Sequence, residues 1–422
     1  MPTVPYEAFL RLVWTRNLYT ALEGEPVAVI SSGSPNPAPG VDVLDASVEI
    51  DGVTLRGPVA IHRRASDWHA HLHHIDPAYD GCILHAVAEN DAVICRTDGK
   101  VIPTVRMIYP QQLEERYGEL VAGSDSYRCG TELSRQPRVK LCGLLTELTV
   151  ERLERKYDDF LRLYREANNN WNEAFYITLF KTMGMGANAE PYMKLARRVS
   201  FVNVCKVRES TQAVEALLLG ASGQLMYIDC PDDYTLALQK EFRHLSRRFD
   251  IVPMRGAEWN LRRHNPHNHP VVRIAELAAL LASQDFMFSK LLGCRTPDEV
   301  RGILSVSASE YWTTHSRLGV KSPYSVKSFG EMMLDNLCIN LVAPMMFTYG
   351  KVSGEEQLKE TAIEMLERTR AENNIYTRGW RSRGVEIENA FFSQGLLQLS
   401  KTYCDKKRCA ECIIGRKALC SR

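Results

Sequence analysis

The strongest constraint on the fold is a change in hydrophobic periodicity along the chain. Before residue 108, short runs rich in β-branched residues lie at 46–50, 53–62, 82–87, 93–96 and 101–105. The dipeptide Asp51-Gly52 favours a tight β-hairpin turn between the first two runs. After residue 144, apolar residues recur at the three- and four-residue spacing of amphipathic helices. Strands and helices are therefore segregated along the chain, which predicts an α+β fold.

This pattern predicts four segments in a chain of 422 residues, which is long enough for two or three domains. The first segment, 1–108, contains an amphipathic helix at 5–22 packed on a mixed β-sheet. A large helical region follows at 144–292, and a second helical region at 296–403. The chain ends in a short cysteine-rich tail at 404–422.

Charge and composition exclude several classes of protein. With 52 basic and 51 acidic residues, the net charge of +1 creates no global field that would attract nucleic acid or anionic lipid. Apolar stretches fall short of the ~20 residues that span a bilayer, and Glu7 and Arg11 interrupt the first one, so we expect neither a membrane protein nor a signal peptide. The 12 cysteines are too sparse for a disulfide scaffold, which favours reduced thiols in the cytoplasm. The chain also lacks G-x-S-x-G, Walker and H-E-x-x-H motifs.

Histidines and aspartates gather within the predicted sheet. Six of the 11 histidines are His62, His69, His71, His73, His74 and His85, accompanied by Asp42, Asp67, Asp76 and Asp80. Asp42 opens one predicted strand, and His62 ends another on the same face as residue 60. Neutral imidazoles and carboxylates bind divalent metals and transfer protons near neutral pH, which makes this a candidate Mg²⁺ site. The alternative is a polar surface loop, with His85 as a hydrogen-bonded core residue.

The tail contains Cys404, Cys409, Cys412 and Cys420, with the spacing C-x4-C-x2-C-x7-C. A two-residue separation lets both thiolates of the central pair bind one ion. Four thiolates fit either structural Zn²⁺ or an iron–sulfur cluster, and the spacing does not separate these metals. The alternative is that reduced cysteines are crowded into a basic tail without a metal.

A basic loop with the sequence RRHNPHNHPVVR is a candidate nucleic-acid contact. Arg262, Arg263 and Arg273 surround two prolines, which stiffen the loop, and their guanidinium groups are suited to bidentate binding of phosphate. The alternative is an exposed connection between helices.

Several long segments resemble one family. They include PGVDVLDASVEIDG, GPVAIHRRASDWHAHLHHIDPAYDGCILHAV, WNEAFYITLFKTMGMGANAEPY, RRHNPHNHPVVRIAELA, ENAFFSQGLLQL and YCDKKRCAECIIG. Over nearly its whole length the chain resembles DUF2851, an uncharacterised bacterial family. The resemblance is specific, but it implies no established activity.

The order of elements in the N-terminal part is also similar to the PD-(D/E)xK nuclease fold, which is restriction-endonuclease-like. In such nucleases carboxylates hold Mg²⁺ and a lysine activates the nucleophile. The resemblance places the acid of the second strand on Asp42 and the D/E-x-K step on Ala60-Ile61-His62, so that His62 would serve as base. The resemblance to DUF2851 implies the sequence Glu-Ile-His at these three positions. Because this chain has Ala60 in place of the glutamate, one expected Mg²⁺ ligand is missing.

The sequence supports two main hypotheses. The first is a Mg²⁺-dependent phosphodiesterase acting on DNA or RNA, in which Asp42 holds the metal and His62 acts as base. Supporting roles would fall to Asp67, His71, His73 and Asp76, and backbone phosphate would bind to Arg262, Arg263 and Arg273. The second is a non-catalytic scaffold that binds nucleic acid or a protein partner, with the cysteine site as a structural clamp. A third hypothesis uses the histidines as a transition-metal site for another hydrolysis.

Overall fold

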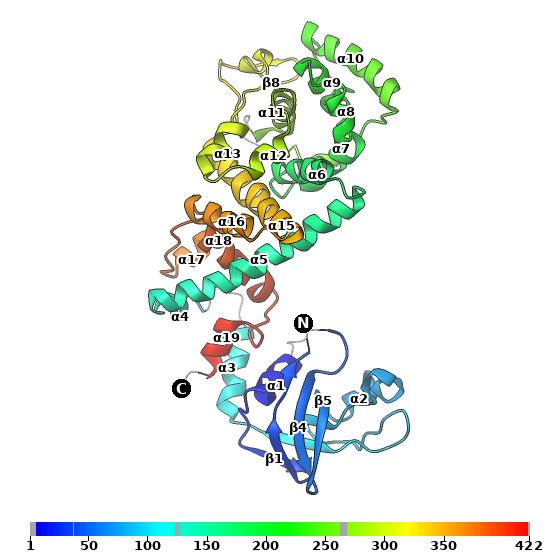
Figure 1. Ribbon diagram of the computed structural model, residues 1–422, viewed down its shortest axis with the longest axis vertical. Helices are drawn as coiled ribbons and strands as arrows, with labels where there is room; N and C mark the ends of the chain where they lie inside the picture. The colour runs from blue at the N-terminus through cyan, green and yellow to red at the C-terminus, as the bar shows by residue number, and fades with distance from the viewer. Residues whose placement is uncertain (1–5, 37, 123–126, 128, 262–267, 421–422) are drawn as a thin grey trace. The chain divides into compact units, whose positions relative to one another are not determined.

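The structure is a computed structural model that describes residues 6–36, 38–122, 127, 129–261 and 268–420. The chain divides into two compact units, which are coloured by residue number in Figure 1. The N-terminal unit comprises Met1–Leu144, Arg378–Glu386 and Leu396–Arg422, and the helical unit comprises Leu145–Thr377 and Ile387–Gly395. The predicted α+β class is confirmed.

The boundaries of these units differ from the four predicted segments. Most of the two predicted helical regions lies in one unit, because their helices share a single apolar core. The tail belongs to the N-terminal unit, because Ala410 and Leu419 are buried in the core of that unit. Packing between segments far apart in the sequence therefore sets the boundaries.

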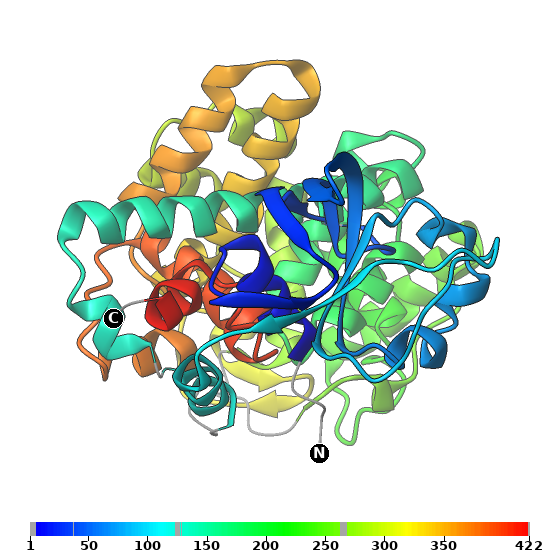
Figure 2. The ribbon, with the colours of Figure 1, turned by 90° about the horizontal axis from the view of Figure 1, so that it is seen from below.

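A seven-stranded mixed sheet forms the centre of the N-terminal unit and is drawn blue to cyan in Figures 1 and 2. Its strands are β1 (Ala21–Gly24), β2 (Val27–Ser31), β3 (Ser34–Pro35), β4 (Val43–Ile50), β5 (Val53–Arg64), β6 (Leu84–Glu89) and β7 (Thr104–Ile108). Their order is β1-β7-β6-β5-β4-β2, with β3 beside β4. Strands β5, β6 and β7 run parallel to one another, and the other pairs are antiparallel.

The β4–β5 hairpin has the turn predicted from the sequence. Ile50 pairs with Val53, and the two turn residues both have left-handed backbones, with φ 51° at Asp51 and 77° at Gly52. The other predicted strands overlap β6 and β7, except for 93–96. That segment forms only an isolated bridge near its end, at Cys95.

Helix α1 (Tyr6–Thr15) packs against β5 and is shorter than the predicted helix at 5–22. It ends because Asn17 adopts a left-handed backbone, and the Leu18 amide donates to the carbonyl of Val13. Side chains alternate along β5, so that Ile61 joins the core under α1, whereas Ala60 faces the opposite side of the sheet.

Short helices connect and cover the remaining strands of this unit. They are α2 (Asp67–Ala70), the 3₁₀ helices η1 (His73–Ile75) and η2 (Pro77–Tyr79), α3 (Gln111–Ala122), α4 (Gly130–Ser134) and α19 (Ile413–Cys420). The segment from α2 to η2 joins β5 to β6, and α19 packs against α3.

The helical unit is built almost entirely from helices. They are α5 (Arg138–Glu166), which begins in the N-terminal unit, α6 (Trp171–Met183), α7 (Ala189–Arg198), α8 (Phe201–Cys205), α9 (Thr211–Ala221), α10 (Asp233–Phe249), α11 (Pro270–Ser283), α12 (Met287–Leu292), α13 (Pro297–Leu304), α14 (Glu331–Leu337), α15 (Ala343–Ser353), α16 (Glu356–Arg368), α17 (Ile375–Arg381) and α18 (Ala390–Gln398). Residues 378–381 of α17 and 396–398 of α18 belong to the N-terminal unit. Strands β8 (His315–Arg317) and β9 (Val320–Lys321) form a small hairpin. Among the described residues, no helix is both long enough and apolar enough to cross a bilayer.

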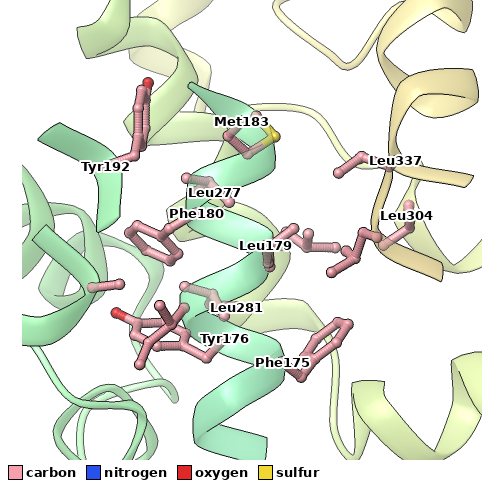
Figure 3. Close-up of a cluster of buried hydrophobic side chains, with 14 of the residues drawn as sticks. Phe175, Tyr176, Leu179, Phe180, Met183, Tyr192, Leu277, Leu281, Leu304 and Leu337 are labelled. Atoms are coloured by element: carbon pink, nitrogen blue, oxygen red, sulfur yellow. The ribbon is translucent and has the colours of Figure 1, made fainter. Parts of the chain in front are cut away.

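Helix α6 lies at the centre of the apolar core of this unit. Figure 3 shows Phe180 on the side of Tyr192, and Leu179 on the side of Leu304 and Leu337. All five side chains are buried. A helix that is apolar on more than one side requires neighbours on each side, which accounts for the single large core.

The close approach of α9 and α10 gives a test of this packing. A Cβ added to Gly220 would lie 2.1 Å from the ring of Phe242, whereas a Cβ added to Gly302 in α13 would meet no atom within 4 Å. We therefore expect Gly220→Ala to destabilise the protein by about 1–3 kcal/mol. Gly302→Ala is expected to stabilise α13 by up to about 1 kcal/mol, because alanine has the higher helix propensity. Urea unfolding of both variants measures the difference, and equal stabilities would contradict the packing.

Candidate metal centre

Three histidines of the N-terminal unit converge at the end of β5. His62 lies on β5, His71 directly follows α2, and His73 begins η1. One ring nitrogen from each lies within 4.8 Å of the others. This is the only such group of three among the residues that the structure describes.

The backbone between His71 and His73 has an unusual conformation. Leu72 has a left-handed φ of 63° and an exposed side chain. Such a backbone is unfavourable for leucine, and it lets the flanking histidines both approach His62. The strained backbone of Leu72 therefore lies between two of the three converging histidines.

A buried tryptophan packs against two of the three histidines. Trp68 is fully buried, makes edge contacts with the rings of His62 and His73, and donates from Nε1 to the carbonyl of Cys95 at 3.0 Å. Tyr79 stacks on His73 with 3.8 Å between ring centroids. These contacts fix the positions of the rings before any ligand binds.

Burial favours the neutral form of His62, His73 and His85. Burial, together with the neighbouring His85, His73 and His71, lowers the pKa of His62 to about 2. Burial and then His73 lower the pKa of His85 to about 3, and burial and then His71 lower the pKa of His73. Neutral imidazole is the form that binds a metal, so protons do not compete for His62 and His73 near pH 7.

The hydrogen bond between His62 and His85 selects the nitrogen available to a ligand. The Nδ1 atom of His62 lies 2.8 Å from Nε2 of His85. When His62 donates this hydrogen bond, its Nε2 carries no proton and is free to bind a metal. Histidine ligands of metals are commonly oriented by such a second hydrogen bond, which is the role we assign to His85.

Two carboxylates accompany the imidazoles. Asp42 immediately precedes β4, and its Oδ1 accepts from Nη2 of Arg11 at 2.7 Å while its Oδ2 accepts from the Ile61 amide at 2.8 Å. Burial raises the pKa of Asp42, and Arg11 opposes that shift. Burial also raises the pKa of Glu7, and the charges of His71 and Asp42 act on this carboxyl group. A carboxyl group with a raised pKa beside a cluster of titratable groups is a candidate proton carrier.

Sequence reasoning missed Glu7 as a site residue. It was noted only as a charge within the N-terminal helix, yet it lies four residues before Arg11, and the charges of Arg11 and Asp42 both act on it. The spacing of Glu7 and Arg11 on one helix face was a signal that could have identified it. The sequence does not show that Asp42 lies beside the same face.

The position of the acid in the expected D/E-x-K motif is occupied by Ala60, which carries no carboxylate. Ala60 has no exposed surface and packs in a small apolar cluster with Trp68, Tyr79 and Cys82. Three imidazoles favour Zn²⁺ and related transition metals, whereas Mg²⁺ prefers oxygen ligands. The geometry therefore favours a transition metal over the Mg²⁺ expected from the sequence.

The remaining acids and histidines of this region contact the backbone or one another. Oδ2 of Asp67 accepts from the Arg64 amide at 2.9 Å, and Oδ1 of Asp76 accepts from the Ala78 amide at 2.9 Å. Both acids therefore stabilise the conformation of the connection between β5 and β6. The rings of His69 and His74 contact each other, with 4.8 Å between their centroids.

A cleft of about 430 Å³ lies beside Asp42 in the N-terminal unit. Its lining includes Arg11, Asn36, Ala38, Pro39, Gly40, Val41, Asp42, Arg408 and Glu411. Two arginines in one cleft provide donors for an anionic group, although both also contact an acid. The cleft is therefore a candidate position for part of an anionic substrate.

The predicted basic loop is not assembled as a phosphate clamp in the described residues. Arg262 and Arg263 lie outside the residues that the structure describes. Arg273 is buried in α11, and its guanidinium group donates to Glu276 at 2.6 Å and to Asn268 at 2.5 Å. Because these internal partners use the guanidinium group, we do not assign Arg273 to phosphate binding.

The fold and the histidine group together define an α+β protein with a candidate metal centre on its sheet. The chain belongs to the family described as protein of unknown function (DUF2851), whose model matches residues 7–375. Neither a curated protein nor a solved structure matches the chain.

Proposed function

We propose that the N-terminal unit is a metal-dependent phosphodiesterase that acts on nucleic acid, with a transition metal bound by His62, His71 and His73. The observation that carries this proposal is the convergence of three imidazoles beside Glu7 and Asp42. Three protein ligands are typical of catalytic zinc sites, because a position then remains open for water or substrate.

The arrangement of elements supports a nuclease-like core. An N-terminal helix, the β4–β5 hairpin, a short helical connection and the parallel strand β6 follow in the order expected for a PD-(D/E)xK fold. Asp42 and His62 stand at the positions that the resemblance assigns to the second-strand acid and to the base. The histidine ligands would then compensate for Ala60.

Each residue has a chemical role in this proposal. A divalent ion would polarise the phosphate and lower the pKa of an attacking water. Glu7 would accept a proton from the attacking water, and Asp42 holds Arg11 at the edge of the cleft, where its guanidinium group would bind the phosphate. His85 orients His62.

The decisive experiment compares two double variants of the same loop. His71→Ala/His73→Ala removes two proposed ligands, whereas His69→Ala/His74→Ala removes the neighbouring histidine pair and serves as the control. We expect the first to lose on the order of 100-fold in Zn²⁺ or Mn²⁺ affinity and in metal-dependent cleavage of DNA or RNA. The control should retain both properties. Equal losses, or equal retention, in the two double variants would refute the site.

A non-catalytic scaffold is the second candidate function, and the burial of Ala60 favours it. Such a protein would bind nucleic acid or a protein partner without cutting. Binding of DNA or RNA whose affinity falls with salt, with no cleavage in Mg²⁺, Mn²⁺ or Zn²⁺, would support this function over the phosphodiesterase.

A further inference from the structure

The first three tail cysteines lie around one tight turn of the N-terminal unit. Cys404 ends the π-helix η7 (Leu399–Cys404), and its carbonyl accepts from the Lys407 amide at 3.0 Å. Lys407 has a left-handed φ of 55°, which reverses the chain toward Cys409 and Cys412. Cys412 is buried, and the Sγ atom of Cys409 lies 3.9 Å from the carbonyl of Leu120 at the end of α3.

The fourth tail cysteine lies away from this turn. Cys420 is the last residue of α19 and is exposed. The helix begins at Ile413, directly after Cys412, and rises about 1.5 Å per residue, so Cys420 lies roughly 10 Å along the helix axis from its start. A regular helix therefore separates Cys420 from the other three tail cysteines.

A different cysteine is anchored beside the turn by packing contacts. The ring of Tyr127 contacts Trp380, with 5.2 Å between centroids, and a Cβ added to Gly379 would lie 2.2 Å from the Tyr127 ring. Trp380 in turn donates from Nε1 to Oγ of Ser400 at 2.8 Å, one helical turn before Cys404. The segment that contains Cys129 is thus held against the helix that ends at Cys404.

The electrostatic surroundings of Cys404 include the same residues. Burial raises the pKa of the Cys404 thiol, and the thiols of Cys412, Cys129 and Cys409 raise it further.

We propose that Cys129, Cys404, Cys409 and Cys412 hold a metal centre, with Cys129 rather than Cys420 as the fourth ligand. The centre joins a segment that follows α3 to the distant tail. It would add a covalent link to the apolar packing of Ala410 and Leu419 in the core of the N-terminal unit. The proposal is independent of the histidine site and of the phosphodiesterase function.

The described thiols are not as close together as the ligands of a single zinc ion, which is consistent with an iron–sulfur cluster. Tetrahedral Zn–S bonds of about 2.3 Å place thiolates ~3.8 Å apart. Among the described residues, no three cysteine Sγ atoms lie within 4.8 Å of one another. A multi-iron cluster with four cysteine ligands holds its thiolates farther apart than one zinc ion does, and we therefore propose a cluster.

The experiment measures iron, acid-labile sulfide and zinc in the full chain purified without oxygen. We expect the native protein and Cys420→Ser to contain iron and sulfide with the visible absorption of a cluster. Cys129→Ser is expected to contain at least tenfold less iron and sulfide than the native protein. Retention of the metal by Cys129→Ser, or its loss from Cys420→Ser, would overturn the ligand assignment. Zinc in place of iron and sulfide would overturn the cluster.

A second measurement covers the case in which Cys129→Ser fails to fold. The native protein is alkylated with and without prior removal of the metal by a chelator, and the modified cysteines are mapped by mass spectrometry. We expect Cys420 to react in both samples, and the four proposed ligands to react only after removal of the metal. Alkylation of Cys129 in the metal-loaded protein, with Cys420 protected, would refute the proposal.

Discussion

Lowering the pH from 7 to 5 is expected to destabilise the metal-free N-terminal unit by about 4 kcal/mol. His62 and His85 have pKa values of about 2 and about 3 in the folded protein, whereas an unfolded histidine titrates near ~6.5. Below pH ~6.5 the unfolded chain takes up protons that the folded chain does not. Each of the two histidines then removes about 1.4 kcal/mol of stability per pH unit.

The stabilising effect of these neutral imidazoles is therefore fully present above pH ~6.5 and declines as the pH falls toward their folded pKa values. Urea unfolding at pH 7, 6 and 5 measures the slope. The variant His85→Gln removes one titrating group and should reduce the slope by about 1.4 kcal/mol per pH unit. A free energy of unfolding that does not change between pH 7 and pH 5 would contradict the burial of these two rings.

The substitution Ala60→Glu is expected to destabilise the N-terminal unit by at least about 3 kcal/mol and to produce no Mg²⁺-dependent cleavage. Ala60 has no exposed surface and packs among Trp68, Tyr79 and Cys82. A larger side chain overpacks this cluster, and its carboxylate loses its hydration. Thermal and urea unfolding, together with a cleavage assay in Mg²⁺, measure both effects.

Ala60→Gln is the matched control for this prediction, because glutamine has nearly the same size without the charge. The difference in stability between the two variants isolates the cost of burying the carboxylate. If Ala60→Glu is as stable as the native protein and cleaves nucleic acid with Mg²⁺, the carboxylate reaches a metal beside Asp42. Our assignment of a histidine-based transition-metal site would then be wrong.

Local features of the fold were predictable from the sequence. The Asp51-Gly52 turn, the strands that it joins and the helices after residue 144 depend on the conformations of residues close together in the chain. The sequence predicted a helix at 5–22, but the helix ends earlier, at Thr15. The spacing of apolar residues does not reveal the left-handed backbone at Asn17 that ends it. The candidate histidines were recognised by composition alone.

The proximity of residues from distant segments was decided only by the tertiary structure. The sequence named His62, His71 and His73, but it did not show that Leu72 adopts the backbone that brings them together, or that Glu7 lies near them. The sequence likewise placed Arg273 in an exposed loop, whereas the structure buries its guanidinium group inside the helical unit.

The sequence by itself therefore determined the α+β class, the main strands and the residue types available for a metal site. The tertiary structure decided which of these residues meet, as it did for His62, His71 and His73. The physical reason is that helix and strand formation depends on local backbone preference and hydrophobic period. Side-chain proximity depends on how apolar faces far apart in the chain pack into a common core.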